Sequence, residues 1–342
     1  MVKVLVVISP VIYKSLPLDR TLKELKHESR IFFNEEFSLV CSYAKKKLDE
    51  LGFHSARNKY NLEKFIELKN MIQNFNPDAI LFVNIVTSIF SPKQLSEIRE
   101  IVERQNCKLL IFFVDPLIKL PHVNECLNYF DRIFSYDHGD IRRLKDVASI
   151  EYCPVGYPIE YEQVLPSGER AIDIVFVGAP WKRRLTFFEP LAKFALENQI
   201  KFQFYGPTEN SRYFWKKNIL SLKFPNASKC VIDRRINPSE AAKVYSNAKI
   251  CLNLHTADVT SPNPRTFEIL ATKSFELVDE RENYSGLIPG KDLVTFNGSD
   301  DLVEQVKYFL RHEDERMEIA MNGWKKVVPE FRLSKCLERV LQ

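Results

Sequence analysis

Short apolar runs alternate with amphipathic segments along the first 150 residues of the chain. The apolar runs predict strands at 4–9, 79–83, 109–114, 132–136 and 150–153. Apolar positions at helical spacing predict helices at 62–75, 91–105 and 139–147. Strands that are apolar on both faces lie in parallel sheets that helices cover on both sides. The sequence therefore predicts an N-terminal, Rossmann-like α/β domain over residues 1–160.

The segment after the first strand has the spacing of one long helix. In residues 28–51 the apolar side chains fall on a single stripe, and Gly52 follows as a helix cap. A short strand is then expected at 53–56. We therefore expect one helix to cross this part of the domain.

The pattern restarts after a polar, turn-rich segment at 154–170. A fresh apolar strand at 172–177 ends at Gly178, and strands and helices alternate again from there. Further strands are expected at 202–205, 230–233, 250–254, 275–278 and 293–296, and helices at 181–198, 214–222, 238–247, 300–310, 314–324 and 333–341. A restart of this kind indicates a second doubly wound domain. We predict this domain at 171–328, and a C-terminal helix within 329–342 that packs back toward the first domain.

Composition narrows the class of protein. The chain has 342 residues, 45% of them hydrophobic and 27% charged, as in a globular protein. A net charge of +4 suits a small anionic ligand and argues against nucleic acid as a partner. The seven cysteines are scattered without a CxxC pair, which favours a reducing, cytoplasmic setting. No apolar run reaches transmembrane length, and the apolar N-terminus predicts a strand and not a signal peptide.

The segment 261–268, Ser-Pro-Asn-Pro-Arg-Thr-Phe-Glu, carries the most chemistry. It joins the strand at 250–254 to a helix start. Free backbone N–H groups at such a start bind anions, and Arg265 adds a forked donor for phosphate. Glu268 is placed to accept hydrogen bonds from ribose hydroxyls. The alternative is a plain helix start, in which Pro264 is the first helical residue and Glu268 complements the helix dipole.

Three stretches of the C-terminal half resemble known enzymes. Residues 249–279, 173–178 and 302–323 resemble group 1 glycosyltransferases, most closely the CgeB-like or spore-maturation branch. The N-terminal half resembles that family only in its alternating pattern. The resemblance implies an α/β GT-B fold, in which two Rossmann-like, doubly wound domains face a central cleft and helices complete the C-terminus.

The resemblance also assigns roles by position. It implies that Glu268 holds the donor ribose and that Arg265 and Thr266 face the diphosphate. His255 ends the central strand and is a candidate to touch phosphate or sugar, or else a hydrogen-bonded structural histidine. The remaining donor-site candidates are Gly178, Lys182, Arg183, Arg184, Ile232, Asp233, Asn253, Asn263 and Phe267. The resemblance places Ile232 and Asp233 at the nucleotide base. It places the basic trio, Lys182, Arg183 and Arg184, at the phosphates. The alternative for this trio is a solvated helix start.

The sequence departs from the family at the donor sugar. Many retaining members carry two glutamates separated by seven residues, but position 260 is a threonine here. The usual sugar contact is therefore lost, moved to Asp258 or supplied by the backbone. Both the sugar and the stereochemical outcome stay open.

Sugar transfer places developing charge on the β-phosphate of the leaving group. Arg265, the basic trio and the helix N-terminus can stabilise this charge without a metal, and no Asp-x-Asp pair is present. We therefore expect neither a metal nor a cofactor. An inverting enzyme also needs a general base, for which Asp115 at a strand end is the candidate, unless Asp115-Pro116 is only a turn. The family favours retention, which needs no such base.

The expected function is transfer of a sugar from a UDP- or GDP-sugar to a glycan, lipid-linked or protein acceptor in cell-surface polysaccharide synthesis. A non-hydrolysing sugar-nucleotide epimerase and a two-lobed binding module without catalysis are the alternatives, because they share the architecture. Apolar and basic side chains at 11–26 suit peripheral contact with the inner membrane face. The alternative there is an ordinary loop and helix packed on the sheet.

Overall fold

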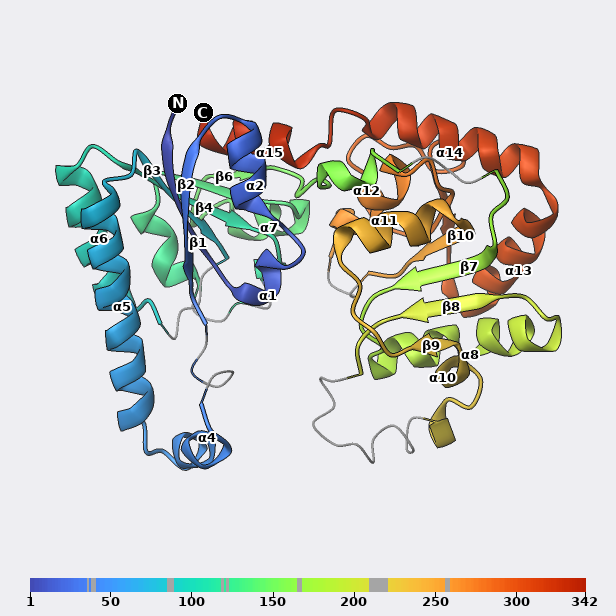
Figure 1. Cartoon of the computed structure of the whole chain (residues 1–342), viewed down its shortest axis with the longest axis horizontal. Helices are drawn as coiled ribbons and strands as arrows, with labels where there is room; N and C mark the ends of the chain where they lie inside the picture. Colours follow the sequence, from blue (N-terminus) through green and yellow to red (C-terminus); the bar gives the residue numbers. More distant parts are fainter. Residues whose placement is uncertain are drawn as a thin grey trace. The chain divides into compact units, whose positions relative to one another are not determined.

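A computed structural model describes residues 1–35, 37, 41–84, 89–117, 120, 123–164, 168–208, 221–255 and 259–342. They form two compact units, one of residues 1–155 with 334–342 and one of residues 156–333. Each unit holds a six-stranded sheet in which all neighbouring strands are parallel (Figure 1). The predicted fold, two doubly wound α/β domains, is confirmed.

The sheet of the first unit has the order β2-β1-β3-β4-β5-β6. Its strands are β1 (Lys3–Ile8), β2 (Glu28–Phe33), β3 (Ala79–Val83), β4 (Lys108–Phe113), β5 (Arg132–Ser135) and β6 (Ile150–Tyr152). The connecting helices are α1 (Pro10–Tyr13), α2 (Leu18–Glu24), α4 (Tyr43–Glu50), α5 (Ser55–Phe75), α6 (Pro92–Arg104), the 3-10 helix η2 (Val123–Tyr129) and α7 (His138–Leu144). Strand order reverses between β1 and β3, which is where doubly wound sheets bind ligands.

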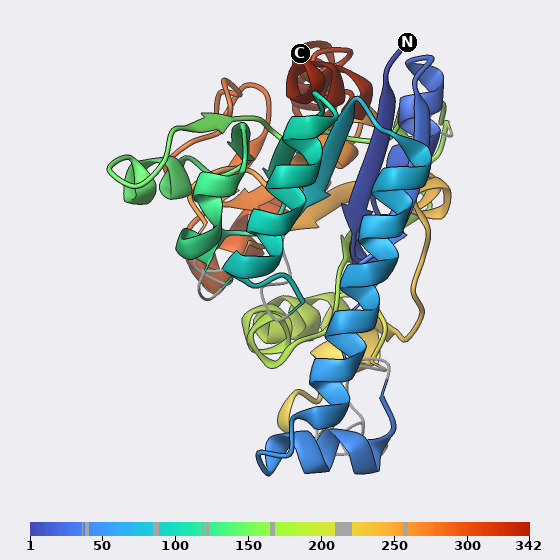
Figure 2. The same cartoon turned by 90° about the vertical axis from the view of Figure 1, so that its left-hand side faces the viewer.

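Alternate side chains of these strands face opposite helical layers. Leu5, Ile80 and Ile111 share one buried cluster with α5 and α6, which run along the same face of the sheet (Figures 1 and 2). The last helix, α15 (Leu333–Leu341), belongs to this unit as well. Lys108 Nζ donates to the carbonyl of Gln342 at 3.0 Å, which ties the C-terminus to the start of β4.

One predicted helix is wrong. Residues 28–33, expected as the start of a helix, form β2, which pairs in parallel with β1 from Lys3 to Ile8. The apolar stripe was misleading because the short run Ile31–Phe33 has no period that distinguishes a strand from a helix, and pairing with β1 stabilises the strand, in which Phe32 is buried. The strand expected at 53–56 is also wrong, because α5 already begins at Ser55.

The second unit repeats the architecture with the order β12-β11-β10-β7-β8-β9. Its strands are β7 (Ile172–Val177), β8 (Phe202–Tyr205), β9 (Val231–Ile232), β10 (Ala248–Asn253), β11 (Glu276–Asp279) and β12 (Val294–Phe296). Its helices are η3 (Ile159–Tyr161), α8 (Lys182–Glu197), α10 (Ala227–Cys230), α11 (Pro238–Ser246), α12 (Pro264–Ala271), α13 (Gly298–Arg311) and α14 (Glu313–Val327). The helix predicted at 214–222 lies mostly outside the described residues.

Two buried clusters, one on each face, hold the second sheet. Phe176, Phe204 and Leu252 pack against α8 and α13, whereas Val175 and Cys251 pack against α11 and α12. The central strand β10 is thus buried on both sides, and its carboxyl end leads directly into the loop before α12. This arrangement fixes the segment 261–268 at the carboxyl edge of the sheet, as the sequence pattern predicts.

Candidate functional site

Helix α12 begins with a side-chain cap and a proline. Asn263 accepts a hydrogen bond from the backbone N–H of Arg265 at 3.0 Å, and Pro264 occupies the first helical turn. Asparagine at the cap and proline just inside the helix both favour this start. The helix N-terminus therefore lies at the edge of the sheet, with Arg265 in its first turn.

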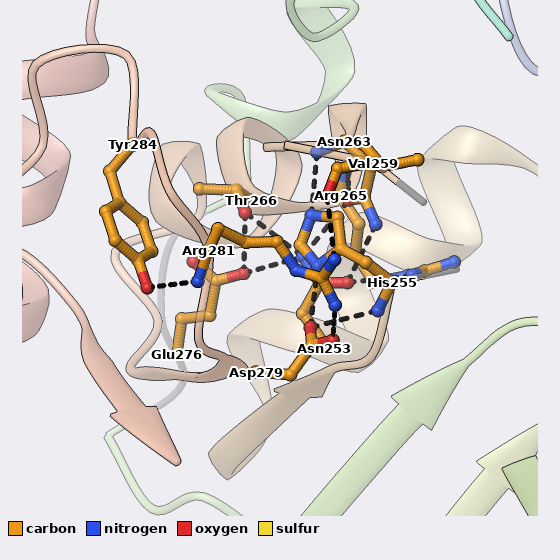
Figure 3. Close-up of polar contacts among 10 residues, drawn as sticks. All are labelled: Asn253, His255, Val259, Asn263, Arg265, Thr266, Glu276, Asp279, Arg281 and Tyr284. Carbon is orange, nitrogen blue, oxygen red and sulfur yellow. Dashed lines mark hydrogen bonds and ion pairs between the residues drawn. The ribbon is translucent and has the colours of Figure 1, made fainter. Parts of the chain in front are cut away.

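A buried asparagine holds Arg265. Asn253, with no exposed surface, accepts from Arg265 Nη1 at 2.9 Å and exchanges two hydrogen bonds with the amide of Asn263 (Figure 3). The predicted site residues Asn253, Asn263 and Arg265 are therefore brought together in one network. Thr266 joins it, because its hydroxyl lies 3.0 Å from Asn253 Nδ2.

Two arginine side chains meet beside Gly178. A Cβ atom at Gly178 would lie 2.8 Å from Arg184 Nη1 and 3.2 Å from Arg265 Nη2, so glycine leaves room for both guanidinium groups. Each guanidinium carbon also lies 5.1 Å from the centre of the Phe176 ring. Burial, and then the positive charge of Arg265, lowers the pKa of Arg184 to about 9. Two like charges held this closely favour an anion between them.

The basic trio at 182–184 does not act as one group. Arg184 is part-buried, donates to the carbonyl of Ala179 at 3.0 Å and lies beside Arg265. Lys182 and Arg183 are exposed and line an open cavity of about 490 Å³ with Thr186, Phe187 and Ser299. Of the three predicted phosphate ligands, Arg184 alone is placed with Arg265 in this part of the structure.

His255 uses both ring nitrogens inside the protein. Nδ1 lies 2.7 Å from the Asp279 carboxylate, and Nε2 accepts the backbone N–H of Asn263 at 2.9 Å. Burial lowers the pKa of this histidine, and the two contacts define a neutral ring with its proton on Nδ1. The ring so placed offers no nitrogen to phosphate or sugar; it fixes the loop before α12.

Glu268 lies among aromatic hydroxyls. Part of the residue reaches the surface, yet burial raises the pKa of its carboxyl to about 7, while Arg265 and a hydrogen bond from Tyr161 act in the opposite direction. Tyr161 stacks on Tyr245 with the ring centres 6.2 Å apart. A carboxyl in such surroundings can accept hydrogen bonds from a diol, and its role at a ribose stays a prediction.

Ile232 and Asp233, the residues assigned to the nucleotide base, make hydrogen bonds within the second unit. The carbonyl of Ile232 accepts backbone N–H groups from Gly206 and Arg234, at 3.1 and 2.7 Å. Asp233 is exposed and accepts from the backbone and the hydroxyl of Thr208. Phe267 is buried and stacks on Phe331 at 4.5 Å, so its side chain is part of the core and not of the site surface.

Asp115 lies in the first unit, at the carboxyl end of β4. It is exposed, and its carboxylate accepts from Asn84 Nδ2 at 2.9 Å. Asn84 has a φ of 57° and also accepts from the N–H of Val114 at 2.9 Å, so a left-handed residue orients the carboxylate. The structure thus gives Asp115 a fixed position at the strand end.

Several residues of the site were missed. Glu276 is fully buried and accepts from Asn253 and Thr266, and Asp279 orients His255. Two acidic residues in the otherwise apolar run Phe275–Asp279 are a signal that sequence reasoning could have used. Gly206 was also not predicted as part of the site. A Cβ atom there would collide with the carbonyl oxygen of Gly178, so glycine is required.

No cluster of three or more His, Cys, Asp or Glu side chains able to hold a metal ion occurs among the described residues. None of the described helices is both long enough and apolar enough to cross a membrane. The candidate Asp258 lies outside the described residues.

Known proteins resemble this chain in sequence and fold. Residues 177–342 match the family described as glycosyl transferase-like. The chain is 25% identical over 214 residues to spore protein CgeB of Bacillus subtilis (strain 168), which covers 56% of this chain and 63% of that relative. The alignment thus spans less than two thirds of the relative's length.

Solved structures match over nearly the whole chain. A glycosyltransferase from Rickettsia africae ESF-5 has a TM-score of 0.66 at 15% identity and covers 99% of this chain and 97% of its own. Anabaena HepE in complex with UDP and glucose has a TM-score of 0.66 at 12% identity, with coverage of 100% and 98%. A UDP-GlcNAc 2-epimerase from Neisseria meningitidis bound to UDP-GlcNAc has a TM-score of 0.58 at 13% identity and covers 99% of both chains. The predicted resemblance to CgeB-like glycosyltransferases is therefore confirmed: residues 177–342 match the glycosyl transferase-like family, and the solved glycosyltransferase structures share the two-domain α/β fold of the chain.

Proposed function

We propose that this chain transfers a sugar from a nucleoside-diphosphate sugar to an acceptor. The observation that carries the proposal is the pair Arg184 and Arg265, held beside Gly178 at the N-terminus of α12. Two guanidinium groups and a helix N-terminus make a strong site for a diphosphate. The glycosyl transferase-like match supports this proposal, as does the likeness to HepE, whose structures hold UDP and UDP-glucose.

The chemistry follows from the charge that sugar transfer creates. Breaking the bond between the anomeric carbon and the β-phosphate oxygen leaves a nucleoside diphosphate with an added negative charge. Fixed positive groups lower the barrier most when they are already in place and poorly solvated. Arg184 fits this requirement, because burial has already removed much of its water. We propose that the reaction needs no metal.

The remaining roles are extensions of this proposal. Glu268 binds the ribose, and the nucleotide of the donor is UDP or GDP. Asp115 serves as general base if the reaction inverts the anomeric centre, and retention, favoured by the family, requires none. The acceptor is a glycan, a lipid-linked sugar or a protein in cell-surface polysaccharide synthesis, at the cytoplasmic side of the membrane. Val11, 56% exposed, suits contact with that membrane, whereas Leu16 and Leu22 are buried in the first unit.

A screen of sugar nucleotides tests the proposal. UDP or GDP should raise the melting temperature, since a ligand that binds only the folded state stabilises it. Slow hydrolysis of one sugar nucleotide, releasing free sugar and nucleoside diphosphate, should identify the donor. Absence of any shift with every nucleoside diphosphate at millimolar concentration would contradict the assignment of the donor site.

An epimerase is the second candidate, because a sugar-nucleotide epimerase shares the fold at a TM-score of 0.58. This function predicts interconversion of a UDP-sugar with no acceptor present. Nuclear magnetic resonance of each sugar nucleotide incubated with the protein separates the two. Appearance of the epimer favours the second function, and hydrolysis without epimer favours transfer.

A further inference from the structure

Glu276 is a carboxyl buried beneath the candidate donor site. It has no exposed surface, and burial raises its pKa to about 7. Oε1 accepts two hydrogen bonds, from Asn253 Nδ2 at 2.9 Å and from Thr266 Oγ1 at 3.0 Å. Oε2 is buried and has no hydrogen-bond partner in the described part of the chain. Burying a carboxyl with only half of its acceptor capacity used costs stability, so a compensating role is expected.

The two donors come from different elements of the site. Asn253 ends β10, Thr266 lies in the first turn of α12, and Glu276 itself begins β11. A single oxygen therefore joins the strand, the helix start and the neighbouring strand. Figure 3 shows these three side chains together with Arg265, which donates to Asn253.

The same contact decides how the Asn253 amide is oriented. An asparagine amide has a donor end and an acceptor end, and its neighbours select between two orientations. Glu276 accepts, so the Nδ2 end faces it and the Oδ1 end faces Arg265. Oδ1 then accepts from Arg265 Nη1 at 2.9 Å. The reverse orientation would place two donors, Nδ2 and the guanidinium group, against each other.

We propose that Glu276 is a positioning residue: acting through Asn253, it holds the Arg265 guanidinium beside Arg184. The inference rests on the proposed function, because it gives the arginine pair its fixed geometry before a diphosphate arrives. A preformed anion site gains affinity, since no side chain has to be ordered on binding. Glu276 acts on the ligand only through Asn253 and Arg265.

Substitutions at Glu276 separate geometry from charge. Glu276→Gln keeps an acceptor oxygen at the same reach and removes the charge, whereas Glu276→Asp keeps the charge and withdraws the oxygens by one methylene. The inference predicts that E276Q binds UDP or GDP within about threefold of the wild type and that E276D binds at least about tenfold more weakly. Isothermal titration calorimetry measures both. Val306→Ala, a buried change in α13 of the same unit, is the control for lost stability and should leave affinity within about twofold.

A double-mutant cycle tests the route through Arg265. Arg265→Lys keeps a positive charge but removes the forked donor that bonds to Asn253. In this background E276D should weaken binding less than about twofold further, because the group it acts through is already changed. Equal losses in both backgrounds, or a loss in E276Q as large as that in E276D, would overturn the inference while leaving the proposed function standing. A wild-type protein that binds no nucleoside diphosphate overturns the proposed function, and the inference with it.

Discussion

Lys182 and Arg184 are two positions apart in the sequence, yet their surroundings differ sharply. Arg184 is part-buried, lies against Phe176 and Gly178 and has a pKa lowered to about 9. Lys182 and its neighbour Arg183 are exposed on an open cavity. A run of basic residues therefore says little about which member binds an anion. The proposed function assigns the anion to the less hydrated member, Arg184, because charge–charge interactions strengthen as water is removed.

The largest expected effect is at Arg265. Arg265→Ala removes one guanidinium group of the pair together with its bond to Asn253, so UDP or GDP affinity should fall by about 100-fold or more. Calorimetry with the full chain measures the loss. A fall smaller than about threefold would show that the diphosphate lies elsewhere.

A substitution at Gly178 should disrupt the pair Arg184 and Arg265 in a second way. In Gly178→Ala the added methyl group meets Arg184 Nη1 at 2.8 Å and Phe176 at 3.0 Å, so the guanidinium must move. We expect affinity to fall by about tenfold with a modest change in melting temperature. Gly168→Ala, at a position with open space around it, is the matched control and should bind as the wild type does.

The pH dependence of stability reports on the buried carboxyl. Burial raises the pKa of Glu276 to about 7 from the ordinary value of 4.5. The folded state then holds a proton that the unfolded state has lost, so this group's stabilising contribution is present below pH 4.5 and is lost as the pH rises through 7. The loss is on the order of 3 kcal/mol.

The glutamine in Glu276→Gln cannot ionise, so this variant should not lose stability as the pH rises through 7. The free energy of unfolding of E276Q relative to the wild type should rise between pH 5 and pH 8. Urea unfolding at several pH values measures this difference. A difference that stays constant with pH would show that Glu276 keeps an ordinary pKa.

His255 gives the smallest expected effect on binding. His255→Gln removes part of the link between Asp279 and the backbone of Asn263, which should cost about 1–3 kcal/mol of stability. Affinity for UDP or GDP should fall only about threefold, because the ring touches the loop and not the ligand. A loss as large as that of R265A would restore the predicted contact of His255 with phosphate or sugar.

The sequence predicted the fold because its signals were redundant. Uninterrupted apolar strands, the restart near residue 172 and the proline–asparagine helix start at 263–264 all agree with the same architecture. The failure at 28–33 arose because a run of three apolar residues is too short to show a period, and only pairing with β1 decided between helix and strand.

The candidate site was predictable only in part. Arg265 and Asn253 were identifiable because a strand end and a helix start meet at the same sheet edge. Sequence spacing could not tell Arg184 from Lys182, because burial depends on the neighbouring strand and on Gly178. It also left His255 open between two roles, since Asp279 comes from another strand.

Two double variants with equal loss of charge test the central claim most directly. R184A/R265A and K182A/R183A each remove two positive charges from the same unit, so long-range electrostatics change equally. Titration of each with UDP and GDP compares the two sites. The structure predicts that R184A/R265A loses detectable binding while K182A/R183A stays within about threefold of the wild type. Equal losses in the two variants would contradict the assignment of the diphosphate to the arginine pair.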